Sequence, residues 1–244
     1  MKILLAPSET KIQGGTDNFN LNSLLFSELT PIRKKLLHQY INILQKNNFS
    51  ELSKMFGLKK EADIKYYNRD IVHELTLKAI ERYTGVAFDY LKYKELNQDS
   101  QLYIDKNVIL CSNLFGFLRA DDKIPEYRLK QGESIGKLKP EKLYKEQSHV
   151  IEAYLEDEDI LDLRAGFYDK FYKPTKNYTT LKFIKNGKVV SHWAKAYRGL
   201  VLRKVAKEKI ETIEEFMHLS IDNLSIDEIQ TKKNKTEIIY TINN

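Results

Sequence analysis

Four short stretches of the chain concentrate side chains that could bind an anion or move a proton. They are Ser8, Glu9 and Lys11 near the start, SNLFGFLRADDKIPEYRLKQG (112–132), DLRAGFYDKFYKP (162–174) and SHWAKAYRG (191–199). Each lies beside the end of a predicted strand. Polar groups at strand ends are where α/β sheets usually build their sites. The four stretches are therefore the candidate parts of a functional site.

The 112–132 stretch follows an apolar run and places two arginines on either side of a turn made rigid by Pro125. We expect Asp122 to pair with Arg119 or Arg128 and hold it, while the other arginine faces a phosphate or carboxylate, which suits its planar fork. Tyr127 and Trp193 could offer a stacking surface to a base. The alternative is that Asp122 and Arg128 form a buried, purely structural ion pair.

The other stretches also have a chemical and a plain interpretation. Ser8 and Lys11 match the spacing of a Ser/Lys nucleophile pair, but such a short match often arises by chance. His192, at the end of a β-rich run, is either a general acid/base or a hydrogen-bonded structural residue. Lys195 and Arg198 share one face of a predicted helix, which either lines an anion-binding groove or is simply solvated.

A fifth stretch, LSKMFGLKKEA (52–62), resembles part of a helix-hairpin-helix element, which would extend over 52–67. In that motif, backbone N–H groups of a Gly-containing hairpin meet a phosphate and nearby lysines add charge. Lys59 and Lys60 would supply the charge. Lys59 stands where a second hairpin glycine is expected, so an ordinary helical turn is the alternative.

Composition limits the class of protein. Apolar residues make up 42% and charged residues 30% of 244 residues, and the formal net charge is +6, which is compatible with a polyanionic partner. The one cysteine, Cys111, excludes an intrachain disulfide and a multi-cysteine zinc site. No nucleotide- or metal-binding motif is present, so neither a cofactor nor a metal is expected. The apolar runs are too short for a signal peptide or a membrane span, so we expect a cytoplasmic monomer.

Strands and helices alternate along the whole chain, as expected for one mixed α/β or α+β domain over 1–244. Apolar runs predict strands at 2–6, 107–111, 159–163 and 235–242, and helical spacing predicts helices at 31–45, 50–56, 61–67, 71–83, 139–155 and 194–210. Two β-rich runs around Asn186-Gly187 predict a hairpin over 179–193 with a type I′ turn. These elements would carry the polar stretches at their ends.

Taken together, the stretches resemble the signatures of the YaaA family, which is linked to peroxide stress. NLFGFLRADDKIPEYRL, DLRAGFYDKF, SHWAKAYRG and the opening KILLAPSETKIQGG match four family segments in family order, spanning 2–199. Two positions depart from the pattern: Ala120 replaces a frequent proline, and Ala165 replaces a frequent serine. A role for a serine hydroxyl at 165 is therefore in doubt in this chain.

The resemblance implies a cytoplasmic protein with a mixed α/β fold of its own, a helix-hairpin-helix element and a positively charged cleft. It implies binding to DNA, and protection against hydrogen peroxide by limiting free iron and the oxidative damage that follows.

Two functions remain open. The first is a protein that binds duplex or branched DNA through its phosphates, using Lys11, Lys59, Lys60, Arg119, Arg128, Arg164, Lys195 and Arg198. The second is an enzyme acting on a nucleotide or on damaged nucleic acid, whose pocket joins Ser8, Glu9, Asp122, Tyr127, Arg164, Tyr168, His192 and Lys195, with His192 or Glu9 as the acid/base. A small phosphorylated ligand would fit either. An open basic groove favours the first, and a pocket joining the four stretches favours the second.

Overall fold

The computed structural model describes residues 1–243, apart from the side chains of Ser191 and His192. Its main sheet has eight strands in the order β10-β11-β8-β7-β1-β4-β5, with β9 paired to β8 outside this path. The strands are β1 (Lys2–Leu5), β4 (Val108–Ser112), β5 (Gly116–Arg119), β7 (Ile160–Asp162), β8 (Tyr178–Lys185), β9 (Lys188–Val189), β10 (Leu224–Lys232) and β11 (Lys235–Ile242). A small antiparallel sheet joins β2 (Asp17–Asn18), β3 (Leu75–Lys78) and β6 (Lys123–Ile124).

The central strands of the main sheet are parallel. Parallel pairing links β11 to β8, β8 to β7, β7 to β1 and β1 to β4, whereas β5, β9 and β10 pair antiparallel to their neighbours. The carboxyl ends of parallel strands share one edge of a sheet. The loops that leave β1 and β7 therefore emerge side by side, which brings two of the polar stretches together.

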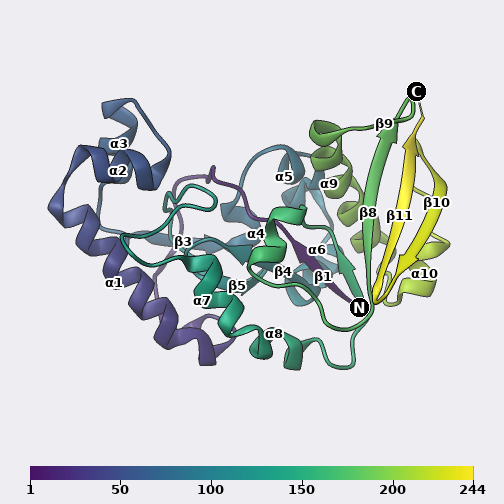
Figure 1. Cartoon of the computed structure of the whole chain (residues 1–244), viewed down its shortest axis with the longest axis horizontal. Helices are drawn as coiled ribbons and strands as arrows, with labels where there is room; N and C mark the ends of the chain where they lie inside the picture. Colours follow the sequence, from purple (N-terminus) through teal and green to yellow (C-terminus); the bar gives the residue numbers. More distant parts are fainter. Residues whose placement is uncertain (244) are drawn as a thin grey trace.

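Helices surround this sheet and extend beyond it (Figure 1). They are α1 (Thr30–Lys46), α2 (Phe49–Phe56), α3 (Glu61–Tyr67), α4 (Ala79–Arg82), α5 (Val86–Leu91), α6 (Gln98–Asn107), α7 (Pro140–Glu146), α8 (Ser148–Tyr154), α9 (Ser191–Glu208) and α10 (Ile213–Met217), with 3-10 turns at Leu21–Ser23, Ser27–Leu29, Tyr93–Glu95 and Gly166–Lys170. Figure 1 shows α2 and α3 at the far end of α1, and α9 beside β8. None of the described helices is long and apolar enough to cross a membrane.

Two buried arginines hold the irregular segments to the core. Arg33 on α1 donates hydrogen bonds to the carbonyl oxygens of Leu25, Phe26, Phe115 and Phe117. Arg82 on α4 donates to those of Ile12, Gly14, Leu75 and Ile124. Both side chains are fully buried. A buried charge is tolerated when its donors are satisfied, and each guanidinium here is surrounded by carbonyls from several segments.

Gly199 allows α9 to approach α5 closely. A Cβ placed at this position would overlap the carbonyl oxygen of Ala87 and lie 2.9 Å from its carbon and 3.0 Å from the backbone nitrogen of Leu91. These are backbone atoms of α5, which cannot rotate out of the way. The short distance between the start of α5 and the first turns of α9 therefore depends on the absence of a side chain at 199.

Most of the expected elements are present, and the mixed α/β class is confirmed. The predicted strands at 2–6, 107–111, 159–163 and 235–242 correspond to β1, β4, β7 and β11. The hairpin is confirmed at its turn, where Asn186 and Gly187 have φ of 51° and 72°, as a type I′ turn requires. Its second strand ends at Val189, and the expected strand residues from 191 onward belong to α9.

Three expectations were wrong in detail. The periodic segment 71–83 is not one helix but β3 followed by α4, because β3 pairs with both β2 and β6. The segment 139–155 forms two helices, which meet at Gln147. Finally, β10 was not expected at all.

The close approach of α5 and α9 gives a stability test. Gly199→Ala should lower the free energy of unfolding by about 2–3 kcal/mol, because the added methyl must push two backbones apart. Gly166→Ala is the matched control, since a Cβ at 166 would meet no atom within 4 Å. It should stay within about 1 kcal/mol of wild type. Urea unfolding of the three proteins measures both values, and equal stability of the two variants would contradict the packing described.

Candidate functional site

Glu9, in the loop after β1, is the junction of three parts of the chain. Its carboxylate accepts hydrogen bonds from the Arg128 guanidinium at 2.8 Å and from the backbone N–H of Gln131 at 2.9 Å. Arg128 also donates to the carbonyl oxygens of Glu9 at 3.2 Å and of Phe56 at 3.0 Å. The first loop, the 112–132 stretch and the end of α2 are thereby held together around one ion pair.

Lys11 lies behind this junction. Its amine donates to the carbonyl oxygens of Ser8 and Glu9, both at 3.3 Å, and lies 3.9 Å from the ring centre of Tyr127 and 5.0 Å from that of Tyr83. Burial, followed by the nearby Arg128 charge, lowers the pKa of Lys11 to about 7. The two ring faces favour the ammonium form, but they do not replace the lost hydration of a buried charge.

Ser8 and Lys11 do not form a nucleophile pair in this structure. The Lys11 amine reaches the Ser8 carbonyl, whereas the Ser8 hydroxyl lies 3.0 Å from the Thr10 hydroxyl and accepts from the Thr10 N–H at 3.2 Å. The Ser/Lys spacing therefore makes a turn rather than an activated hydroxyl.

Tyr127 belongs to a buried cluster of hydroxyls and cannot stack on a base as expected. Its hydroxyl lies 2.9 Å from that of Tyr83 and 2.7 Å from that of Ser112, and only 3% of the residue is exposed. Burial raises its pKa to about 12. Trp193, at the start of α9, is 46% exposed, and its ring lies near the Tyr197 ring and the Lys185 amine.

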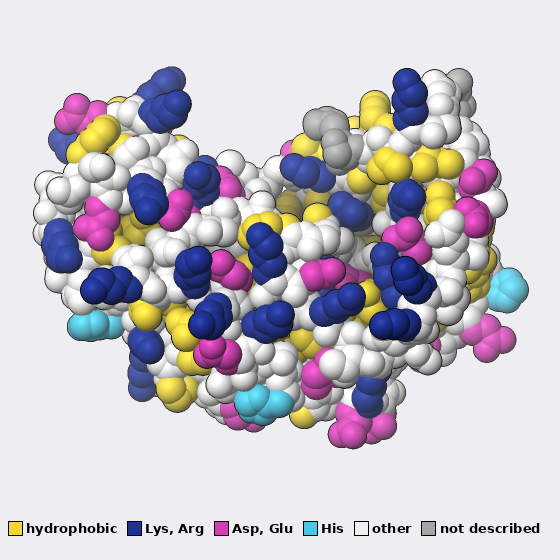
Figure 2. All heavy atoms as spheres, in the orientation of Figure 1, with side chains coloured by type: hydrophobic (Ala, Val, Ile, Leu, Met, Phe, Trp, Pro, Cys, Tyr) yellow, Lys and Arg dark blue, Asp and Glu magenta, His cyan; other side chains and the backbone are white. Residues whose placement is uncertain are grey.

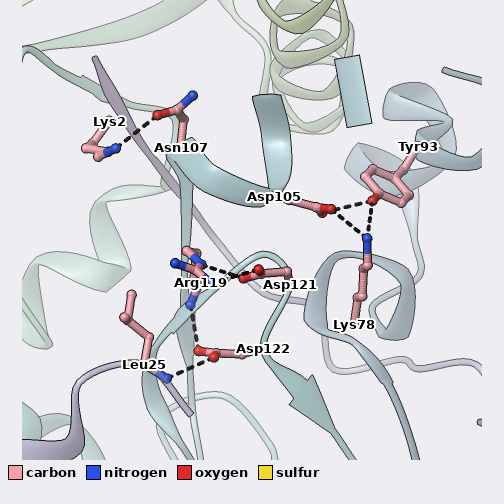
Figure 3. Close-up of polar contacts among 9 residues, drawn as sticks. All are labelled: Lys2, Leu25, Lys78, Tyr93, Asp105, Asn107, Arg119, Asp121 and Asp122. Carbon is pink, nitrogen blue, oxygen red and sulfur yellow. Dashed lines mark hydrogen bonds and ion pairs between the residues drawn. The ribbon is translucent and has the colours of Figure 1, made fainter. Parts of the chain in front are cut away.

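The structure differs from the expected arrangement of Arg119 and Asp122 (Figure 3). Arg119 forms a two-pronged ion pair with Asp121 at 2.5 and 2.8 Å. Asp122 accepts hydrogen bonds from the backbone N–H groups of Leu25 and Arg119, each at 2.8 Å. It therefore holds the main chain in place and, contrary to expectation, pairs with neither the Arg119 nor the Arg128 side chain. Its burial raises the pKa of its carboxyl.

The direction of β5 explains where these residues lie. Because β5 runs antiparallel to β4, Gly116 pairs with Ser112 at the end of β4 and Arg119 pairs with Ile109 near its start. Arg119 and Asp122 therefore lie toward the opposite edge of the sheet from the loop that carries Glu9. The structure does not bring them to the site.

Arg164 is a structural brace at the end of β7. It is 4% exposed and donates to both carboxylate oxygens of Asp162, at 2.8 and 2.7 Å. A further donor lies 3.6 Å from the sulfur of Cys111. Burial raises the pKa of the Cys111 thiol, and Arg164 only partly opposes this effect.

A cavity of about 450 Å³ lies between the loop after β1, the start of α5, the loop after β7 and the start of α9. Its lining contains five of the expected site residues, Ser8, Glu9, Tyr168, Lys195 and Arg198, together with Ala165. A second cavity of about 430 Å³ lies on the other side of the α9 start. It is lined by residues of β7, β8 and β11 and by Arg164, which follows β7, and it shares Ala165, Lys195 and Arg198 with the first.

Lys195 and Arg198 are the two cations that line both cavities. Lys195 is exposed, and Arg198 is half-buried. Burial lowers the pKa of Arg198, and the charge of Asp162 only partly opposes this effect. Among the residues that the structure describes, neither side chain has an acidic partner within ion-pair distance. The face of α9 that carries Lys195 and Arg198, expected to line a groove or to be solvated, lines both cavities.

Lys59 and Lys60 lie apart from this cavity, in the connection between α2 and α3. Both are exposed, and Gly57 ends α2 with φ of 66°. A Cβ at Gly57 would meet the alkyl chain of Lys130, which packs against the hairpin. Two short helices joined at a glycine are therefore present, while their assignment as a helix-hairpin-helix stays a prediction.

Figure 2 shows the face between these regions hollowed, with Lys and Arg side chains on the lobe that carries α2 and α3 and on the lobe that carries β9 and the start of α9. The side chain of His192, the other expected acid/base, lies outside the described part of the structure. Within that part, no group of three or more His, Cys, Asp or Glu side chains could hold a metal ion.

Two contributors to the cavity were missed. Residues 84–88 form one wall, and Gln131 contributes both its lining side chain and the backbone N–H that holds Glu9. The glycine at position 85 could have indicated the wall formed by 84–88, because glycine just after the expected end of a helix suggests a turn, and Gly85 does have φ of 105°. Nothing in the type of residue at Gln131 indicates a role in a site.

The fold and the site define a mixed α/β protein with a ligand-sized cavity at the carboxyl edge of a mainly parallel sheet. The sequence model of the peroxide stress protein YaaA family matches residues 1–230, so the chain belongs to this family. It is 46% identical to an uncharacterised protein of Campylobacter jejuni over 99% of both chains. It is 31% identical to a UPF0246 protein of Corynebacterium glutamicum (strain R) over 90% of this chain and 91% of the relative.

Lys11 gives a pH test of the site. Its pKa is about 7 in the folded protein and 10.5 in a free lysine, so between these values the unfolded chain binds the extra proton. Stability should therefore rise with pH from about 7 to 10, by up to about 1.4 kcal/mol per pH unit, and level off below pH 7.

Lys11→Met removes this titration, so the stability difference between wild type and variant should move in favour of wild type over that range. Denaturant unfolding of both proteins at pH 6, 7, 8 and 9 measures it. A difference that stays constant with pH would show that Lys11 is charged throughout.

Proposed function

We propose that the protein acts in peroxide stress by binding DNA in the hollow between the α2–α3 lobe and the start of α9. The observation that carries the proposal is a set of cations without ion-pair partners on the elements that border the hollow. Lys59 and Lys60 belong to the connection between α2 and α3, and Lys195 and Arg198 to the start of α9. None of the four has a carboxylate partner among the described residues. Cations without acidic partners are available to phosphates.

The chemistry of these cations suits a polyanion read through its backbone. Lysines on an exposed turn are flexible point charges, and neutralising phosphates with them releases counterions. Arg198 adds a planar fork that can bind two phosphate oxygens. By contrast, Arg119, Arg128 and Arg164 are committed to Asp121, Glu9 and Asp162. We therefore assign DNA contact to the first four cations and structural roles to these three arginines.

Membership of the peroxide stress protein YaaA family connects the proposed DNA binding with a role in the cell. We infer that DNA binding serves to limit the damage that free intracellular iron and peroxide cause together. A bacterial strain that lacks its own family member should regain peroxide survival, and a lower level of free iron, when it expresses the wild-type chain. If a variant that no longer binds DNA restores both, the link between binding and protection is wrong.

An enzyme acting on a nucleotide or on damaged nucleic acid is the second candidate. It is favoured by the first cavity, which unites Ser8, Glu9 and Tyr168 with Lys195 and Arg198. Three of the four polar stretches supply these residues, and the 112–132 stretch adds Gln131. Incubation with oxidised, abasic or deaminated duplexes, followed by product analysis, tests it. A product that disappears in Glu9→Gln would favour this candidate over binding alone.

The DNA-binding proposal predicts a specific loss. Lys59→Glu/Lys60→Glu should weaken binding to fluorescent duplex and branched DNA at least tenfold, because it reverses two charges on one side of the hollow. It should also reduce the slope of log affinity against log salt by about two. Fluorescence anisotropy over a salt series measures both.

Lys34→Glu/Lys35→Glu is the matched control. It makes the same charge change at two exposed positions in the first half of α1, far from the α2–α3 end (Figure 1). Its affinity for duplex and branched DNA should stay much closer to that of wild type than the affinity of Lys59→Glu/Lys60→Glu. Equal losses in the two double variants would mean that net charge alone drives binding. If wild type binds neither duplex nor branched DNA, the proposal fails.

A further inference from the structure

Arg198 differs from the other arginines that lie away from solvent. Arg33 and Arg82 are each surrounded by four backbone carbonyl oxygens, and Arg164 is paired with Asp162. Among the described residues, Arg198 has neither kind of partner. Withdrawing a guanidinium from water without a partner costs free energy, and the lowered pKa of Arg198 reflects that cost.

The surroundings of Arg198 define what an added partner would be. Asp162, whose charge acts on Arg198, already has both carboxylate oxygens bound by Arg164. Lys195 lies one turn earlier on the same face, and both side chains line the boundary between the two cavities. Two adjacent cations without ion-pair partners among the described residues match an anion with several oxygens, such as a phosphate.

The rest of the first cavity is not suited to a bare phosphate. Its walls include the apolar side chains of Leu5, Val86, Phe88 and Leu163, with Ser8 and Gln131 as hydrogen-bonding groups. Glu9 lines the cavity as well and would repel a phosphate, although its carboxylate can accept hydrogen bonds from N–H groups. The cavity therefore has a cationic end at α9 and an apolar, hydrogen-bonding end near Glu9.

We propose that this cavity binds a nucleoside phosphate, with the phosphate on Arg198 and Lys195 and the base between the apolar walls near Glu9 and Gln131. The volume of about 450 Å³ lies within the range of small-molecule sites. The carboxylate of Glu9 favours a base that presents an amino group. This inference deepens the proposed function, because it names a ligand for the cavity beside the DNA-binding hollow.

The nucleotide could reach the cavity from two sources. It could be a free mononucleotide, or a nucleotide extruded from DNA that is held across the hollow. Proteins that act on a single base take it out of the stack, which costs least where the base is unpaired or damaged. Both sources present the same phosphate and base to the same residues.

The first test uses titration calorimetry with deoxynucleoside 5′-monophosphates, the matching nucleosides and inorganic phosphate. A monophosphate should bind wild type at least tenfold more tightly than its nucleoside or phosphate alone. Arg198→Ala should lose at least tenfold in affinity, and Arg198→Lys should recover part of it. Lys207→Ala, which removes an exposed lysine near the other end of α9, should bind like wild type.

Equal binding of nucleotide and nucleoside by wild type would overturn the phosphate assignment, whatever the variants do. So would unchanged affinity in Arg198→Ala. If wild type binds no monophosphate, the proposed nucleotide site is wrong, both for a free mononucleotide and for a nucleotide extruded from DNA.

The second test separates the sources and the two proposals. A duplex with an unpaired 2-aminopurine should brighten when wild type binds, because the fluorescent base leaves its stack. Arg198→Ala should bind this duplex more weakly, because one phosphate contact is lost, and at saturating protein it should show no rise in fluorescence, if the base enters the cavity. Monophosphate binding without any brightening would assign the cavity to a free nucleotide.

Lys59→Glu/Lys60→Glu keeps the two proposals distinguishable. This variant should lose duplex affinity yet bind the monophosphate like wild type. If wild type binds monophosphate but no DNA, the DNA-binding proposal fails and the nucleotide site stands. If wild type binds DNA but no monophosphate, the nucleotide site fails and DNA binding stands.

Discussion

The ion pair between Glu9 and Arg128 is the constraint on which the site depends. It joins residues far apart in the chain, and its other hydrogen bonds fix the end of α2 and the backbone at Gln131. The α2–α3 lobe and the loop after β1 are therefore positioned by the same guanidinium. Removing Glu9 would leave the mostly buried Arg128 guanidinium without its carboxylate partner, which costs more than the pair itself contributes.

The electrostatics of the region follow from which cations are already used. Arg128 and Arg164 have carboxylate partners, and Lys11 is buried against two tyrosine rings. Lys195 and Arg198 remain available, and the close contact at Gly199 holds their helix beside α5. The absence of a side chain at Gly199 lets α9 lie close to α5, and both helices contribute to the wall of the cavity that these cations line.

The sequence pattern predicted the elements with a strong local signal. Apolar runs located β1, β4, β7 and β11, and Asn186-Gly187 located the hairpin, because these signals depend on neighbouring residues alone. The segment with β3 was mistaken for a helix because its pairing with β2 and β6 is a long-range contact. The exposed strand β10 has no buried face to give it a pattern.

The candidate site was predicted in part, for the same reason. Ser8, Glu9, Lys195 and Arg198 do line one cavity, as their places after strands indicated. Arg119 lies at the opposite edge of the sheet because β5 runs antiparallel to β4. The partner of Arg128 is Glu9 in the first loop, and no local pattern could specify this long-range contact.

The position of Cys111 has a consequence for oxidation. Peroxide attacks the thiolate, and this thiol is buried, with a raised pKa. A member of a peroxide stress family thus carries its single sulfhydryl out of reach of the oxidant, so this thiol is not oxidised to a sulfenic acid and needs no reductant to restore it.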